Sequence, residues 1–279
     1  MSQNNIIGMV RYSVADSFKK DHPDYGFFNV FEEPYFSERM AMFRGITLRS
    51  FAAQSDKNFV LLVYHSDKMP ADKRALFAAL EKEFPFVRNV FVPGGNMPIP
   101  EDLRGGRIIT FRIDNDDGLP LDFIERLAAI PYDNVAVSIT KIRRVQRVAQ
   151  DKFITSESLY FSNSMGLAYS STDGRSVMDL GNHTLIVNHT KVLSIPGTGG
   201  LQVIHGTNVS NAFHQSRGKD TEIIIMNSAG LAQLLASEGY AKMDLGAMPI
   251  SSFSVSVGAE YGTGVQPDRR PAVGCPYQR

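Results

Sequence analysis

The sequence has few of the features that would place it outside the class of ordinary folded proteins. Its 279 residues include one cysteine, Cys275, which by itself can form neither an internal disulfide nor a cysteine metal site. The 29 basic residues balance the 29 acidic residues, and this zero net charge disfavours a net-basic nucleic-acid-binding protein. No segment approaches the roughly 20 apolar residues of a membrane span, and no leader peptide is recognisable. We expect a cytoplasmic protein with at most peripheral contact at the inner face of the cell membrane.

Strands and helices are expected to alternate through the first half of the chain. Continuous apolar runs predict strands over 6–12, 59–64, 87–92 and 107–113, and apolar residues at threes and fours predict helices from about 37, 70 and 121. This order with short links predicts a doubly wound α/β sheet. The second half is less regular, with strands expected over 160–170, 185–188, 201–205 and 223–226 and a helix over 229–237.

Three polar clusters follow predicted strands. They are Arg11-Tyr12-Ser13, Ser66-Asp67 and the run from Asp114 to Asp117. Ligands of wound α/β sheets bind beyond the carboxyl ends of the strands. If the strands are parallel, these three clusters share one edge of the sheet, and we expect a ligand site there.

The acidic run Asp114-Asn115-Asp116-Asp117 is the sharpest single feature. Three carboxylates this close repel one another unless a cation or hydrogen-bond donors compensate. Carboxylate oxygens suit Mg²⁺ or Mn²⁺, and in a strand-to-loop turn Asp114 and Asp116 can face the same way. The alternative is an Asp/Asn/Gly turn that caps the next helix. The position directly after a buried strand favours the metal site.

Other residues that could bind a ligand could equally have a structural role. His205 could complete the coordination of a divalent ion, or it could be a hydrogen-bonded core residue. Asp67 could accept a hydrogen bond from a base or ribose, or it could cap the helix that begins at Pro70. Arg112 is placed to pair with the carboxylates that follow it. The basic residues between 141 and 147 could meet a diphosphate, although a solvated helix face is the favoured interpretation.

Several stretches together resemble a known family. Residues 48–59 are similar to the first helix and second strand of family-two-type glycosyltransferases. Arg11-Tyr12-Ser13, the string from Arg112 to Asp117 and residues 201–211 together resemble the bacterial putative rhamnosyltransferases. The resemblance covers most of residues 6–212. It implies a GT-A-like fold, a doubly wound mixed sheet flanked by helices, with an irregular C-terminal part that binds the acceptor.

The resemblance also implies a division of the chain. A single domain is expected over residues 1–248, with a nucleotide-binding half at 1–133 and an acceptor-binding half at 134–248. From residue 249 onward Ser, Gly and Pro dominate, and a loosely structured tail is expected over 249–279.

The implied function is metal-dependent transfer of a sugar from a nucleotide-sugar donor to a hydroxyl of a glycan or glycolipid acceptor. Rhamnose is the sugar that the family name suggests, and surface polysaccharide synthesis is the implied setting. By this resemblance, Mn²⁺ or Mg²⁺ is held by Asp114, Asp116 and His205. The residues implied to bind the donor are Arg11, Asp67, Arg112, Asp114 and Asn208.

One departure from the family pattern concerns the catalytic base. Inverting relatives carry a Glu-Asp pair at a helix start, and none occurs between Asp117 and His205. Asp179 is the preferred substitute. The missing pair leaves open a non-catalytic carbohydrate- or nucleotide-sugar-binding protein. A sugar nucleotidyltransferase is disfavoured because the loop over 13–20 has no glycine.

Overall fold

A computed structural model describes residues 5–14, 30–159, 166–181, 183–205 and 223–250. In the first half the elements are β1 (Asn5–Ser13), α2 (Tyr35–Met42), the π-helix η2 (Phe43–Leu48), α3 (Arg49–Ala52), β2 (Phe59–Ser66), α4 (Ala71–Glu83), β3 (Val87–Val92), η3 (Glu101–Leu103), β4 (Ile108–Ile113) and α5 (Phe123–Ala128). In the second half they are β5 (Val135–Ala149), β6 (Lys152–Leu159), β7 (Ala168–Ser171), η4 (Val177–Leu180), η5 (His183–Asn188), β8 (Val192–Ile204), β9 (Ile224–Met226), α6 (Ser228–Ser237) and η7 (Leu245–Ala247).

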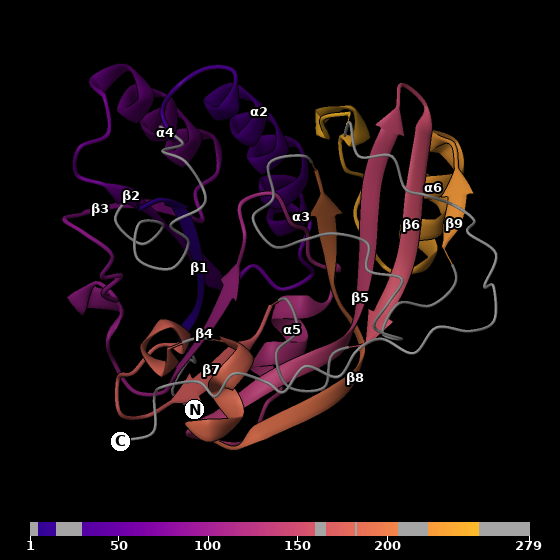
Figure 1. Ribbon diagram of the computed structural model, residues 1–279. Helices are drawn as coiled ribbons and strands as arrows, with labels where there is room; N and C mark the ends of the chain where they lie inside the picture. The colour runs from indigo at the N-terminus through magenta and orange to yellow at the C-terminus, as the bar shows by residue number, and fades with distance from the viewer. Residues whose placement is uncertain (1–4, 15–29, 160–165, 182, 206–222, 251–279) are drawn as a thin grey trace, which may run out of the picture.

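One mixed sheet runs through both halves of the chain (Figure 1). Its order is β3-β2-β1-β4-β7-β5-β6-β9, and β8 pairs with β5 beside this path. The four strands β1 to β4 are mutually parallel, whereas β7 is antiparallel to both β4 and β5. The predicted α/β class is therefore confirmed. None of the helices in the described part of the chain has the length and apolar character that a membrane crossing requires.

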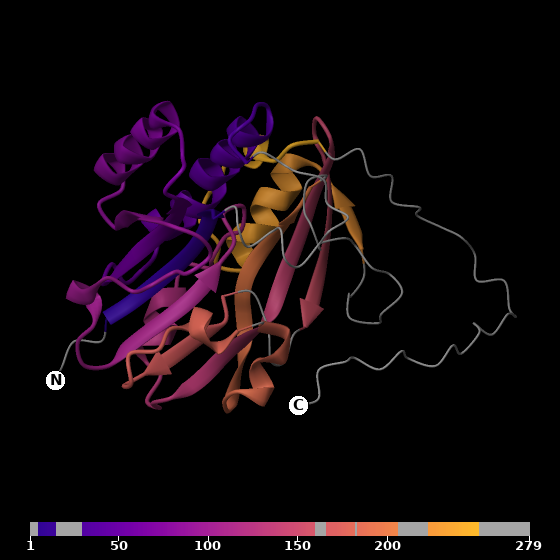
Figure 2. The same cartoon turned by 60° about the vertical axis from the view of Figure 1, so that its left-hand side comes forward.

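Side chains pack on both faces of the sheet, which explains the continuous apolar runs of its parallel strands. On one face Phe43, Phe77 and Phe123 join the residues of the strands in a large core, and α6 packs nearby against β6 and β8. On the other face, Val177 of η4 and Ile186 of η5 cover β1 and β2. Figure 2 shows the long helices on one side of the sheet and the short coral helices on the other.

The basic residues between 141 and 147 do not form a solvated helix face. They lie in β5, where Arg143 and Arg144 are buried. Arg143 donates through Nε to Glu238 at 2.9 Å, and Lys141 pairs with Glu157 at 2.7 Å. Lys141 and Arg143 are thus held by carboxylates of β6 and of the segment after α6, whereas Arg144 donates to the Gln202 side chain. Partners this distant in sequence leave no local signal.

Two further expectations differ from the structure in detail. Residues 185–188 belong to the helix η5 rather than to a strand. The strand expected over 160–170 is present as β7, Ala168–Ser171, and residues 160–165 lie outside the described part. The tail expected over 249–279 also lies outside it from residue 251 onward, so that expectation stays a prediction.

His65 is a buried, neutral histidine in the helix-covered core. Its ring lies 4.1 Å from that of Phe77 and 5.7 Å from that of Tyr12. Its Nε2 donates to Asn89 Oδ1 at 3.0 Å, because the Asn89 amide nitrogen is already a donor to the Phe77 carbonyl. Burial lowers the pKa of His65 from 6.5 to about 3.

The low pKa of His65 predicts that acidification lowers the stability of the fold. Between about pH 6.5 and 3 the unfolded chain binds a proton at His65 that the folded chain excludes. The free energy of unfolding therefore falls on acidification, at up to about 1.4 kcal/mol per pH unit from this residue. Urea unfolding at pH 7.5, 6 and 5 measures the slope. The variant His65→Gln should have a shallower slope than the wild-type chain, and equal slopes would contradict the assignment.

Candidate functional site

The carboxyl ends of β1, β2 and β4 lie at one edge of the sheet. Ser13 ends β1, Asp67 follows β2 and Asp114 follows β4, and the three strands are parallel neighbours. From β1 the chain builds β2 and β3 on one side and then adds β4 on the other. The strand order therefore reverses between β1 and β4. This is the place where ligands bind in open α/β sheets.

The acidic loop after β4 is fastened to β8. Gly118 and Leu201 exchange two backbone hydrogen bonds of 2.9 and 2.8 Å. Asp117 Oδ1 accepts from the Val203 backbone at 3.0 Å. Thr47, in the π-helix η2, donates to the Asp117 carbonyl at 2.8 Å. Short π-helical segments are often found at functional sites. The loop is thus held from two sides, by a helix and by a strand.

Asp116 and His205 come together at this edge. His205 Nε2 and Asp116 Oδ2 are 2.7 Å apart, and both side chains are buried. His205 is the first residue after β8, and the fastening of the acidic loop to that strand creates the contact. The two residues are 89 positions apart in the sequence, and the fold makes them neighbours.

The pair fits a divalent cation in part. Adjacent ligands of an octahedral ion with bonds of 2.0–2.1 Å are about 2.9 Å apart, close to the spacing of this pair. Asp114, the third predicted ligand, instead lies 3.6 Å from Arg112 and is half exposed. Within the described ranges, no group of three or more His, Cys, Asp or Glu side chains could hold a metal ion. Two protein ligands would leave the other positions to phosphate oxygens and water, as is usual for Mg²⁺.

Two buried polar atoms beside the pair have no hydrogen-bond partner among the described residues. They are Asp117 Oδ2 and Asn115 Nδ2. Burial raises the pKa of Asp117 well above its ordinary value, and the charges of Asp116 and Asp114 raise it further. Buried polar atoms are nearly always paired in native proteins. An orphaned carboxylate oxygen next to Asp116 is consistent with a site that a cation or a polar ligand completes.

Arg39 is a site residue that the sequence did not reveal. Its Nη2 donates to the Tyr12 carbonyl at 2.5 Å and to Asn115 Oδ1 at 2.8 Å, so it links α2, the end of β1 and the acidic loop. Its guanidinium also lies 4.7 Å from the centre of the Tyr12 ring. Helical spacing was the available signal, because Arg39 lies three residues after Phe36 and four before Phe43, on the face that packs inward.

The other candidates are distributed as follows. Arg11 and Asp67 are exposed near the same edge, and Arg112 is partly buried beside Asp114. Asn208 lies outside the described residues. Asp179 accepts hydrogen bonds from the backbone and the hydroxyl of Ser176 and forms a capping box at the start of η4. Within the described ranges, Asp179 is bonded to Ser176 and Asp116 contacts His205.

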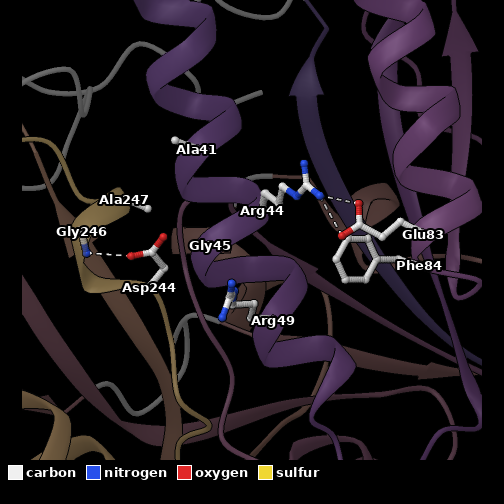
Figure 3. A pocket seen from close by; sticks show the side chains of 9 residues that line it. All are labelled: Ala41, Arg44, Gly45, Arg49, Glu83, Phe84, Asp244, Gly246 and Ala247. Carbon is white, nitrogen blue, oxygen red and sulfur yellow. Dashed lines mark hydrogen bonds and ion pairs between the residues drawn. The ribbon is translucent and has the colours of Figure 1, made fainter.

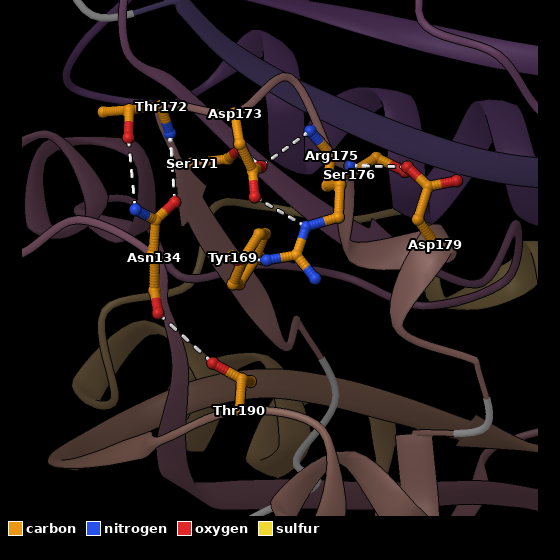
Figure 4. A network of polar contacts seen from close by, with 9 residues as sticks. All are labelled: Asn134, Tyr169, Ser171, Thr172, Asp173, Arg175, Ser176, Asp179 and Thr190. Carbon is orange, nitrogen blue, oxygen red and sulfur yellow. Dashed lines mark hydrogen bonds and ion pairs between the residues drawn. The ribbon is translucent and has the colours of Figure 1, made fainter.

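Figure 4 shows the surroundings of Asp179. Asp173 pairs with Arg175 at 2.7 Å and accepts from the Ser171 hydroxyl at the same distance. Asn134 contacts Thr172 through its side chain and Thr190 through its carbonyl. These contacts fasten the turn after β7 to the start of β5, which is a structural task.

Two cavities lie away from the acidic loop. The first, of about 470 Å³, is lined by Arg44, Arg49, Phe84 and Asp244 among others, and an ion pair of 2.7 Å joins Arg44 to Glu83 at its side (Figure 3). The second, of about 660 Å³, is lined by residues of 121–126, 196–198 and 237–239 and by Lys141. Neither is lined by a residue of the acidic loop.

Comparisons with known proteins give one family and a set of distant structures. The family model described as putative rhamnosyl transferase matches residues 5–217. No curated protein matches the chain. Among solved structures, Staphylococcus aureus TarS 1–349 in complex with UDP-GlcNAc has 9% identity and a TM-score of 0.43, with 76% of this chain and 62% of that chain covered.

Two more structures have lower TM-scores. TarS 1–349 in complex with UDP has 10% identity, a TM-score of 0.37 and coverage of 73% of this chain and 61% of that one. A putative glucose-1-phosphate thymidylyltransferase from Bacillus anthracis, in complex with a sucrose, has 6% identity, a TM-score of 0.30 and coverage of 70% and 87%. The chain therefore spans about three fifths of the TarS 1–349 chains that it matches.

Proposed function

The chain belongs to the putative rhamnosyl transferase family, a family of glycosyltransferases, and from this premise we propose that it transfers a sugar with the help of a divalent metal ion. The donor is a nucleotide-sugar, with rhamnose as the sugar that the family name suggests. The acceptor is a hydroxyl of a glycan or glycolipid, in bacterial surface polysaccharide synthesis. The observation that carries the proposal is the contact of Asp116 with His205 at the edge where the strand order reverses.

Asp116 and His205 would hold Mn²⁺ or Mg²⁺ in this proposal. The ion would supply positive charge where the leaving diphosphate gains negative charge. The protein's own contribution is to fix the two side chains. β8 sets the position of His205, and the bonds from Thr47 and Val203 to Asp117 set the position of the acidic loop.

The donor would lie along the same edge. Asp114 is half exposed beside Arg112 at 3.6 Å, so its carboxylate is held by a cation and remains accessible to ribose hydroxyls. Arg11 at the end of β1 and Asp67 after β2 would extend the donor site across neighbouring strands. Asn208, three residues after His205 in the sequence, completes the proposed set.

A second candidate function is binding of a nucleotide-sugar without catalysis. The favouring observation is that the carboxylate of Asp179, the candidate base, is engaged by Ser176 in a helix cap. Both bonds from Ser176 end on Oδ2, so only Oδ1 of this carboxylate would be available to accept a proton from an acceptor. The proposed donor site does not depend on this residue.

A donor screen tests the proposed function. The purified chain is mixed with UDP- and dTDP-linked sugars with Mn²⁺ or with EDTA, and the melting temperature and the release of nucleoside diphosphate are measured. A donor at 100 times its Kd should stabilise the fold by about 2.7 kcal/mol. We expect stabilisation and release with Mn²⁺ and loss of release with EDTA.

The other outcomes of the screen decide between the alternatives. Stabilisation with no release, even when glycan acceptors are added, would favour the binding protein. Release of pyrophosphate from a nucleoside triphosphate would favour a sugar nucleotidyltransferase. Absence of any response to the whole panel, with and without Mn²⁺, would contradict the proposed function.

A further inference from the structure

The guanidinium of Arg39 is buried without a carboxylate partner among the described residues. The residue is 7% exposed. Its hydrogen bonds within the described ranges both come from Nη2 and end on uncharged oxygens, those of the Tyr12 carbonyl and the Asn115 amide. In that part of the chain, Nε and Nη1 donate to no protein group, and neither is among the atoms sealed from solvent. The N–H groups of Nε and Nη1, which point to different sides of the guanidinium, are therefore available.

The groups that face Arg39 do not neutralise its charge. The Tyr12 ring, 4.7 Å away, and the Tyr35 ring, 5.1 Å away, offer only π-electrons, and burial raises the pKa of the Tyr12 hydroxyl, which keeps it neutral. His65, whose ring lies 5.7 Å from that of Tyr12, is also neutral. In the neighbouring acidic loop, Asp114 pairs with Arg112 and Asp116 contacts His205.

A buried cation of this kind is costly unless an anion accompanies it. Arg39 lies between the end of β1 and the loop after β4, because it bonds to both. That is the point at which the strand order reverses and where the donor is proposed to bind. A guanidinium N–H donates a charge-assisted hydrogen bond to a phosphate oxygen, and such bonds are roughly twice as strong as those between neutral groups.

We infer that Arg39 binds a phosphate group of the donor's diphosphate through an N–H of Nε or Nη1, while its Nη2 holds the acidic loop. This inference rests on the proposed function and adds a second phosphate contact that needs no metal ion. Arg39 would then have two tasks, because the same guanidinium that receives the leaving group also positions Asn115. The competing interpretation is that Arg39 only tethers the loop.

Binding of inorganic pyrophosphate in the presence of EDTA tests the inference by isothermal titration. Arg39→Lys keeps the charge but cannot reach the phosphate while it holds both Tyr12 and Asn115, and Arg39→Gln loses the charge. We expect about a 10-fold weaker Kd for Arg39→Lys and about 100-fold for Arg39→Gln, in line with the loss of charge-assisted hydrogen bonds. Arg88→Gln is the matched control, since Arg88 is partly exposed and paired with Asp102, and its Kd for pyrophosphate should equal that of the wild-type chain.

A second titration, with Mn²⁺ alone, separates a ligand contact from a tether. If Arg39 only positions the loop, its variants should lose affinity for Mn²⁺ and bind pyrophosphate like the wild-type chain, and this result would overturn the inference. Equal pyrophosphate binding by wild type and Arg39→Lys would overturn it even if Arg39→Gln fails to fold. Binding of UDP with Mn²⁺ by the wild-type chain is measured in parallel. If it persists while the inference fails, the proposed function still stands, and if UDP never binds, the function fails as well.

Discussion

Replacing Asp116 by asparagine is expected to lower the rate of glycosyl transfer by at least about 10³-fold, equivalent to about 4 kcal/mol. Asparagine has the size of aspartate and can still contact His205, which lies 2.7 Å from the carboxylate. It lacks the negative charge that would hold a divalent ion. The fold should therefore survive while metal-dependent turnover is lost. Nucleoside diphosphate release with saturating Mn²⁺, together with the melting temperature, measures the two effects separately.

Asp102→Asn provides the matched control for this substitution. Asp102 is an exposed aspartate that pairs with Arg88 and is not part of the acidic loop. Its replacement should leave turnover unchanged. His205→Gln should resemble Asp116→Asn in direction, because both side chains belong to the proposed pair. Full activity of Asp116→Asn with Mn²⁺ would refute the role assigned to the carboxylate.

Gly199→Ala is expected to lower both stability and activity. A Cβ at this position would overlap the carbonyl oxygen of Ile139 on the neighbouring strand β5. The overlap is with a backbone atom and cannot be relieved by turning a side chain. We therefore expect the free energy of unfolding to fall by about 3 kcal/mol, near the upper end for overpacking. β8 would have to shift against β5, and His205 follows directly at the end of β8. Turnover should fall further than the loss of folded protein explains.

Gly105→Ala is the control for the glycine substitution. Apart from Gly105 itself and its two chain neighbours, no atom lies within 4 Å of the position that a Cβ would take there, so alanine should fit without displacement. Urea unfolding compares the free energies of the two variants, and turnover is measured at a temperature where both are folded. If Gly199→Ala unfolds like Gly105→Ala and retains full activity, the close approach of β8 to β5 is not needed to place His205.

The parallel half of the fold could be predicted from local sequence. Strands buried on both faces require long apolar runs, and the runs at 59–64 and 107–113 correspond to β2 and β4. Because parallel strands end at one edge, the order of apolar runs and polar clusters was enough to place the polar residues together. For His205 the residues alone left a metal ligand and a core histidine open, and the resemblance to a family implied the ligand. Its contact with Asp116 depends on pairing across 89 residues.

The burial of charged side chains in this fold depends on contacts that local sequence patterns do not encode. Arg143 in β5 is buried because Glu238, 95 residues later, accepts its guanidinium. Arg39 is internal because the end of β1 and the acidic loop supply uncharged oxygens for it. Polar groups of this type resemble surface residues in a sequence pattern. Only the tertiary fold shows which partner removes the cost of burying them.

Binding of Mn²⁺ in the presence of UDP tests the central claim most directly. Electron paramagnetic resonance counts the bound ions, because the signal of free Mn²⁺ disappears on binding. One ion per chain is expected for the wild-type chain and for Asp102→Asn, and Asp116→Asn should bind none at the same concentrations. A wild-type chain that binds no Mn²⁺ with UDP, or an Asp116→Asn variant that binds it equally well, would contradict the account.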